Sequence, residues 1–322
     1  MDGPWSSNIR YRLNQAGWMC LMGPERLSSI QGCAAGFRSV AGNPGEVMMV
    51  KKPEVAFGRC IYGLGVMALG MVCLAWGRFD PGQPVPLDFP GRSVLAYVAA
   101  AFLCAAGAAV LWRRTMALGA AALAAYYALI VVVLMDGRAV LVHDAVFVVD
   151  RNIAEQLVVM AGKLLADIAS NISEQLAIAA GGLIIYASSA RIDAALATRL
   201  ARLGQVVFAV CALFFGAAHF IYMNLTAPLV PRWLPPTQVF WAYATGIGHI
   251  AAGVAILTGV QARLAAILLT AMYASFGLLV WAPLLLANPT SHPIWSENAL
   301  NLALVGVAWV VADSLTRPRH VA

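Results

Sequence analysis

The sequence predicts an all-α membrane protein in which two parallel four-helix transmembrane repeats, eight spans in all, pack side by side. A chain of 322 residues that is 61% hydrophobic and 11% charged has too few polar side chains to cover a water-soluble globule. It also contains repeated apolar stretches of about 18 to 24 residues, enough to cross a hydrocarbon core of ~30 Å. Finally, "AYVAAAFLCAAGAAVL" begins at Ala96, and a similar phrase, "AYATGIGHIAAGVAIL", begins 146 residues later at Ala242.

The apolar stretches are expected to be helices, because a helix satisfies its own backbone hydrogen bonds in lipid. The expected spans are 57–76, 94–112, 115–135, 172–190, 204–222, 239–257, 264–286 and 297–313.

The basic residues predict the orientation of these spans. With the N-terminus inside, 15 of the 21 Lys and Arg residues lie in cytoplasmic segments, and such an excess is typical of the inner side of a membrane. The net charge of +6 is therefore interpreted as a topology signal rather than as a nucleic-acid-binding surface. We expect a lipid bilayer as the main partner and both termini in the cytoplasm.

The first 50 residues show no signal-peptide pattern and are expected to be a disordered leader. Met48 and Met49 stand just before the first span, and either is a candidate for the natural start. The first four-helix unit is expected at 51–195 and the second at 200–316. The six cysteines show no CxxC spacing, so neither a disulfide framework nor a redox motif is indicated.

The internal repeat extends over the whole of both units. With an offset of 146 residues, 12 of the 32 pairs from Ala96 to Tyr127 are identical, and Tyr127 aligns with Tyr273. For the fourth helix the offset is 123, which aligns "SEQ" at Ser173 with "SEN" at Ser296. Since each unit has an even number of spans, both enter the membrane in the same direction.

The change of offset reflects extra residues in the first unit. The segment 139–168 is too charged to cross the bilayer comfortably, and its apolar residues recur at steps of three and four. We expect an amphipathic helix on the outer interface. A ninth span is the alternative, but it would place Arg191, Arg199 and Arg202 outside.

Two histidines in the second unit are candidates for chemistry. His219 lies near the outer end of the fifth span, whereas His249 is about 16 Å deep in the sixth by the helix rise. A polar ring near the midplane is a functional candidate, although a satisfied interhelical histidine is the alternative. The different depths argue against one metal or haem bound by both rings.

The eighth span begins "WSENALNLAL", in which Glu297 and Asn301 share one helix face. His219 is expected at the same level, with Trp241 and Tyr243 nearby. Such a group would hydrogen-bond a quinone headgroup and relay its protons. Helix capping by Ser296 and Glu297 is the alternative explanation.

The first unit has different residues at the aligned positions. It has Cys73 in place of His219 and Leu103 in place of His249, but it keeps Glu174 in place of Glu297. We therefore expect the first unit to be a scaffold and the second to hold the site.

The second unit resembles the DoxX-like family of bacterial membrane proteins. The matching residues are Gly216, His219, Phe220, Val230, Pro231, Leu234, Pro235, Trp241, Tyr243, Thr245 and Gly246. The family usually has a glutamate where His249 stands. The resemblance implies a bacterial inner-membrane protein and, for some members, a membrane subunit of a quinone-linked oxidoreductase complex beside a soluble redox protein. A small-solute transporter and a structural or assembly factor without catalytic activity remain alternatives.

Overall fold

Helices are the only regular elements in the part of the chain that the structure describes. The computed structural model describes residues 56–83, 85, 89–144 and 172–316. The expected leader, and residues 145–168 of the expected amphipathic segment, lie outside these ranges.

Six helices are long and apolar enough to cross a membrane, which indicates a membrane protein. One of them, over 262–287, is continuous and consists of α10 (Ala262–Phe276), the π-helical turn η3 (Gly277–Trp281) and α11 (Ala282–Ala287). The other five are α3 (Ala56–Trp76), α4 (Arg92–Leu111), α7 (Ala194–Ile221), α9 (Gln238–Thr258) and α12 (His292–Ser314).

The two remaining expected spans are also helical. Residues 172–189 form a helix, and α5 (Met116–Asp144) contains a shorter apolar stretch, Met116–Val132. The expected third span, 115–135, lies almost wholly within α5, which continues as a helix to Asp144. Between α7 and α9 lie two short elements, α8 (Met223–Thr226) and η2 (Ala227–Leu229).

Local sequence determines several helix ends. The Asp193 side chain accepts hydrogen bonds from the backbone N–H groups of Ala195 and Leu196, at 2.8 and 3.1 Å, and so caps α7. Thr237 caps α9 in the same way through the N–H of Phe240. Gly259 ends α9 with a φ of 79°, a conformation that glycine adopts readily.

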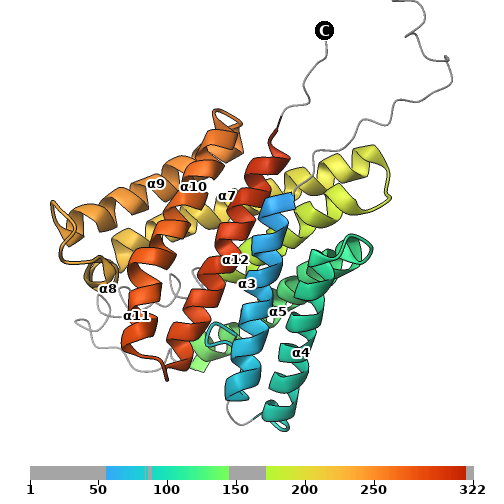
Figure 1. Cartoon of the computed structure of the whole chain (residues 1–322), viewed down its shortest axis with the longest axis horizontal. Helices are drawn as coiled ribbons and strands as arrows, with labels where there is room; N and C mark the ends of the chain where they lie inside the picture. Colours follow the sequence, from blue (N-terminus) through green and yellow to red (C-terminus); the bar gives the residue numbers. More distant parts are fainter. Residues whose placement is uncertain (1–55, 84, 86–88, 145–171, 317–322) are drawn as a thin grey trace, which may run out of the picture. The chain divides into compact units, whose positions relative to one another are not determined.

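The closest helix crossing joins α3 to α12, which lie side by side in Figure 1. A Cβ atom on Gly306 of α12 would lie 2.3 Å from the backbone nitrogen of Tyr62 in α3. A Cβ atom on Gly65 of α3 would lie 2.4 Å from the nitrogen of Ala303. The two backbones are therefore in direct contact, as small residues allow in a membrane, where helices associate largely through close packing.

The helix over 172–189 joins the first part of the bundle to the second. The Tyr62 hydroxyl of α3 donates to the Ile178 carbonyl at 3.0 Å. On the other side, Gly204 of α7 allows that helix to approach the Ala180 carbonyl. The helices α3, α12, 172–189 and α7 thus form the centre of the bundle, with α4, α5, α9 and α10 outside them.

Contacts between helix ends show which charges share one end of the bundle. The contacts are Arg59 with Met116, Gly58 with Val310, Arg202 with Leu257, Gln205 with Ser314 and Arg263 with Asp313. This end, which we call the basic end, carries Arg59, Arg113, Arg114, Arg199, Arg202 and Arg263. The opposite end, which we call the acidic end, carries Asp80, Glu174 and Glu297, together with only three basic residues among the described side chains, Arg78, Arg92 and Arg232.

Candidate functional site

The structure divides the predicted site residues between two places. Glu297 belongs to a group of three acidic residues, Asp80, Glu174 and Glu297, which we call the carboxyl cluster. His219 and His249 lie together elsewhere, as a histidine pair. No hydrogen bond, ion pair or ring contact joins His219 to Glu297 within the described ranges. The structure therefore gives no support to the expected contact between them.

Three different segments supply the carboxyl cluster. Asp80 lies in the loop after α3, Glu174 in the first turn of the helix over 172–189, and Glu297 in the first two turns of α12. A Cβ atom on Gly82 would lie 3.1 Å from the Oδ1 of Asp80 and 3.6 Å from the Oε2 of Glu174, so these two carboxyl groups lie on either side of Gly82. None of the three forms an ion pair with a Lys or Arg side chain in the described part of the chain, so no neighbouring cation compensates them.

Asp80 is 8% exposed, and one of its carboxyl oxygens, Oδ1, accepts the Gly82 N–H at 2.9 Å. Burial raises the pKa of Asp80 above its ordinary value, and the hydrogen bond from Gly82 lowers it by less. Asp80 therefore favours its protonated form more than an exposed aspartate does.

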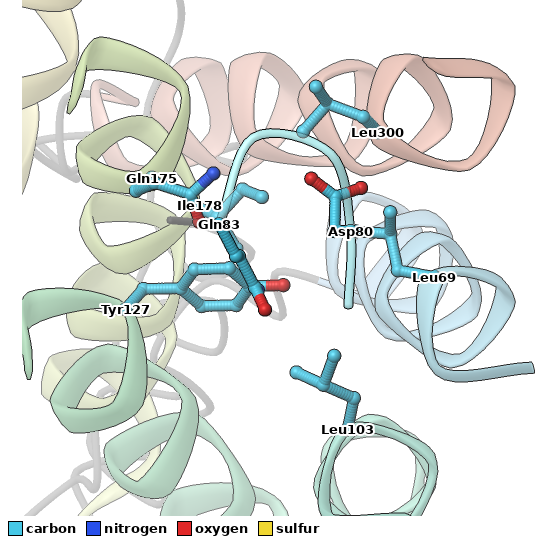
Figure 2. Close-up of a pocket in the computed structure, with 8 residues that line it drawn as sticks. All are labelled: Leu69, Asp80, Gln83, Leu103, Tyr127, Gln175, Ile178 and Leu300. Atoms are coloured by element: carbon cyan, nitrogen blue, oxygen red, sulfur yellow. The ribbon is translucent and has the colours of Figure 1, made fainter. Parts of the chain in front are cut away.

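A small cavity adjoins the carboxyl cluster (Figure 2). Its free volume of about 10 Å³ is close to the minimum for one water molecule. Two buried polar atoms at its wall, the Tyr127 hydroxyl and the Gln175 Oε1, have no hydrogen-bond partner. The lining residues are Leu69, Asp80, Gln83, Leu103, Tyr127, Gln175, Ile178 and Leu300.

The histidine pair lies between α7 and α9, with ring centroids 5.0 Å apart. The Nδ1 of His219 bonds the Phe215 carbonyl at 2.8 Å, and the Nδ1 of His249 bonds the Thr245 carbonyl at 2.9 Å. Because a carbonyl only accepts, each Nδ1 carries the hydrogen, and in a neutral ring each Nε2 is then an acceptor. Neither Nε2 has a hydrogen-bond partner among the described residues.

The expectation that the two histidines lie at different depths is wrong. Gly246 of α9 packs against the Cβ of His219, near the end of α7. The roughly two turns of α9 that precede Gly246 therefore extend beyond the end of α7, where they pack against α8 and η2. Depth counted from the end of each helix therefore misplaces His249 relative to His219. The argument from depth against a shared ligand no longer holds.

Aromatic rings surround the histidine pair. The His249 ring centroid lies 5.5 Å from that of Tyr273, 6.1 Å from Phe215 and 6.2 Å from Phe276. His249 itself is 2% exposed. The pair is thus a polar site within an aromatic niche.

Asn301 is close to this niche. Its side-chain amide donates to the Tyr273 carbonyl at 3.0 Å, and a Cβ on Gly277 would lie 2.8 Å from the same nitrogen. Asn298 donates to the Trp281 carbonyl at 2.8 Å. Both amides thus bind carbonyls beside the π-helical turn, where regular helix bonding is interrupted.

Trp241 and Tyr243 do not contact the histidines. The Trp241 indole donates to the Pro235 carbonyl at 2.8 Å and holds the loop before α9. The Tyr243 ring lies against Phe220 and is 44% exposed. Local contacts therefore account for both aromatic rings.

The repeat offsets relate the cavity to the histidine niche. Five lining residues of the cavity, Leu69, Leu103, Tyr127, Gln175 and Ile178, align with Phe215, His249, Tyr273, Asn298 and Asn301. At three of these aligned positions the residue at the histidine niche is larger or more polar than the one at the cavity: Phe215 for Leu69, His249 for Leu103 and Asn301 for Ile178.

Sequence reasoning missed Asp80, Gln83 and Gln175 as parts of a site. The signal that was present is the pair of motifs "SEQ" and "SEN" at equivalent helix starts. No set of three His, Cys, Asp or Glu side chains with a metal-holding arrangement occurs in the described residues.

Residues 208–312 match a protein family described as a domain of unknown function, DUF8561. No curated protein and no solved structure matches the chain.

Proposed function

We propose that this chain spans a bacterial inner membrane eight times, with the basic end of the bundle in the cytoplasm. The charge difference between the two ends supports this orientation, because Lys and Arg are enriched on the cytoplasmic side of membrane proteins. In single-cysteine variants, a membrane-impermeant thiol reagent added outside should label Arg232→Cys and Asp150→Cys. It should not label Arg114→Cys or Arg199→Cys, and the reverse pattern would refute this topology.

The two four-helix units are proposed to be parallel repeats of one ancestral bundle. The support is the correspondence between the cavity and the histidine niche, since residues aligned by the sequence offsets gather at both places. The central helices also correspond, because α3 packs against α12 as α7 packs against residues 172–189.

The proposed function of the chain is that of a DoxX-like membrane subunit of a quinone-linked oxidoreductase complex. The carrying observation is the histidine pair, with two unpartnered Nε2 acceptors in an aromatic niche. A quinol headgroup has a flat ring that packs against aromatic side chains and hydroxyls that donate to imidazole nitrogens. Neutral histidines at this position can also accept the protons released when a quinol is oxidised.

Quinone extracted from the purified protein tests this function. His219→Ala should lower bound quinone by roughly threefold to tenfold, the loss expected for one hydrogen bond to the headgroup. Cys73→Ala, at the aligned position of the first unit, is the matched control and should leave it unchanged. Equal quinone in His219→Ala and wild type, or none in wild type, would refute the assignment.

Transport of a small solute is the second candidate. The observation that favours it is the cavity, which Leu300 of α12 lines together with residues of the first unit. A solute path between the units would pass this point. Uptake into proteoliposomes that Gln83→Leu abolishes would favour transport over quinone chemistry.

A further inference from the structure

We propose that the cavity beside Asp80 binds one dehydrated alkali-metal cation, Na⁺ or K⁺, through side-chain oxygen atoms of Asp80, Gln175 and Tyr127. This inference goes beyond the proposed quinone chemistry and does not depend on it, because the cavity and the histidine pair share no residue.

Three elements bring these side chains to the wall of one cavity (Figure 2). Tyr127 comes from α5, Gln175 from the helix over 172–189, and Asp80 from the loop after α3. A Cβ atom on Gly82 would lie 3.1 Å from the Asp80 Oδ1 and 3.4 Å from the Gln175 Nε2. The loop therefore packs directly against the Gln175 side chain, and this contact holds the carboxyl group of Asp80 at the cavity.

Two of the oxygen atoms at this wall have no partner. Tyr127 and Gln175 are 1% and 2% exposed, and neither the Tyr127 hydroxyl nor the Gln175 Oε1 has a hydrogen-bond partner. A buried polar atom of this kind calls for an explanation, and a bound water or ion is a common one. Asp80 is also more than nine-tenths buried, and the Gly82 N–H reaches only its Oδ1. The wall thus presents buried oxygen atoms to whatever occupies the cavity.

The charge at the cavity favours a cation over a water molecule. Arg78 stands two residues before Asp80 but forms no ion pair with it within the described ranges. Arg92 instead lies over the Phe79 ring, at 5.7 Å. A water molecule would hydrogen-bond the oxygen atoms but would leave an ionised Asp80 uncompensated, which is costly in a buried site. A bound cation contacts the same oxygen atoms and also balances the charge.

The size and composition of the cavity favour a monovalent ion. Its free volume of about 10 Å³ accommodates one ion without a hydration shell, whereas Mg²⁺ usually keeps several waters. Asp80 is the only acidic residue among the described residues that line it, and Ca²⁺ sites commonly use several carboxylates. Gln83, whose Oε1 accepts from the Tyr126 hydroxyl at 3.3 Å, adds a further neutral side chain to the wall. One carboxylate with amide and hydroxyl oxygens matches the single charge of Na⁺ or K⁺.

Thermal unfolding of the purified full-length protein in detergent tests the proposal. The protein is dialysed into choline chloride and then compared in choline chloride, NaCl and KCl at one ionic strength and neutral pH. A ligand that binds only the folded state stabilises it, so NaCl or KCl should raise the wild-type melting temperature. The rise should saturate and reach about 3–6 °C at roughly tenfold the dissociation constant. The salt that acts at the lower concentration identifies the cation.

Two conservative variants remove the proposed ligands. Asp80→Asn removes the charge and should melt at the same temperature in all three salts. Tyr127→Phe removes only the hydroxyl and should need roughly tenfold more salt for the same rise, the loss expected for one ligand. Tyr273→Phe is the matched control, because Tyr273 aligns with Tyr127 and its buried hydroxyl is also unpartnered. It should keep the wild-type response.

Melting curves in choline chloride show that each variant folds. A salt response that wild type and Tyr273→Phe share, and that Asp80→Asn lacks, supports the proposal. Equal wild-type melting temperatures in the three salts would overturn it, because the cavity would then hold only water. An undiminished response in Asp80→Asn or in Tyr127→Phe would also overturn it, because the cation would then bind elsewhere.

Discussion

Substituting Gly306 with alanine should be among the most damaging single changes in this protein. The added Cβ would lie 2.3 Å from the backbone nitrogen of Tyr62 and 2.5 Å from its Cα. Ordinary contact begins near 3.4 Å, so α3 and α12 must separate by about 1 Å along their central crossing. Overpacking of this kind costs typically about 1–3 kcal/mol, more than the ~1 kcal/mol that alanine gains over glycine within a helix.

Thermal unfolding in detergent, followed by reaction of the buried thiols of Cys73 and Cys211 with a fluorogenic reagent, measures this effect. Gly248→Ala is the matched control, because its Cβ would meet only the Met272 sulfur, at 3.6 Å. The control should unfold at the wild-type temperature or above it, and Gly306→Ala several degrees below. Gly306→Ala at least as stable as wild type would refute the inference that backbone contact sets the α3–α12 crossing.

Three further predictions concern other parts of the bundle. Asp80→Asn should stabilise the protein at neutral pH and flatten its stability against pH. Because burial raises the folded-state pKa of Asp80, the contribution of this residue to stability is fully present below its unfolded pKa and is lost as pH rises through its folded pKa, which melting curves across pH will show. Arg202→Ala should destabilise by about 1 kcal/mol in the same melting assay, since its guanidinium donates to the last carbonyls of α9, whereas Arg199→Ala, with no such bonds, should not. His249→Leu, which introduces the residue aligned in the first unit, should change the free energy of unfolding by less than about 1.5 kcal/mol; a larger loss would mean that the ring is needed for folding.

The sequence was sufficient to predict the helices. Apolar length and local caps act within one segment, so each expected range is helical almost throughout, and Asp193, Thr237 and Gly259 lie at helix ends. The third helix extends past its expected span because the charged residues after 135 break the apolar pattern without breaking the helix. Hydrophobicity thus marks what can enter lipid, whereas backbone hydrogen bonding decides where a helix stops.

The relative positions of side chains on different helices were predicted less well. His219 and His249 belong to helices whose ends are not level, because α9 extends past α7 over α8 and η2. The spacing of residues within one helix does not indicate how far that helix extends past its neighbour. Asp80 was missed for a related reason: it reaches the carboxyl cluster through a loop, and a single sequence does not show which loop folds back over the bundle.

Under the proposed repeat, the cavity of the first unit corresponds to the histidine niche of the second. At aligned positions the second unit has a histidine niche filled by Phe215, His249 and Asn301, while the first has smaller or apolar residues and a water-sized cavity. Glu174 and Glu297 are also aligned by the proposed repeat, and each lies near the start of its helix at the acidic end. Half-buried carboxylates with no bonded cation among the described residues are costly near a membrane, so under the proposed repeat the two glutamates favour a role to which each unit contributes one carboxyl group. Under this proposal, histidines occur at the aligned positions of the second unit and not of the first, whereas both units contribute a glutamate to the carboxyl cluster.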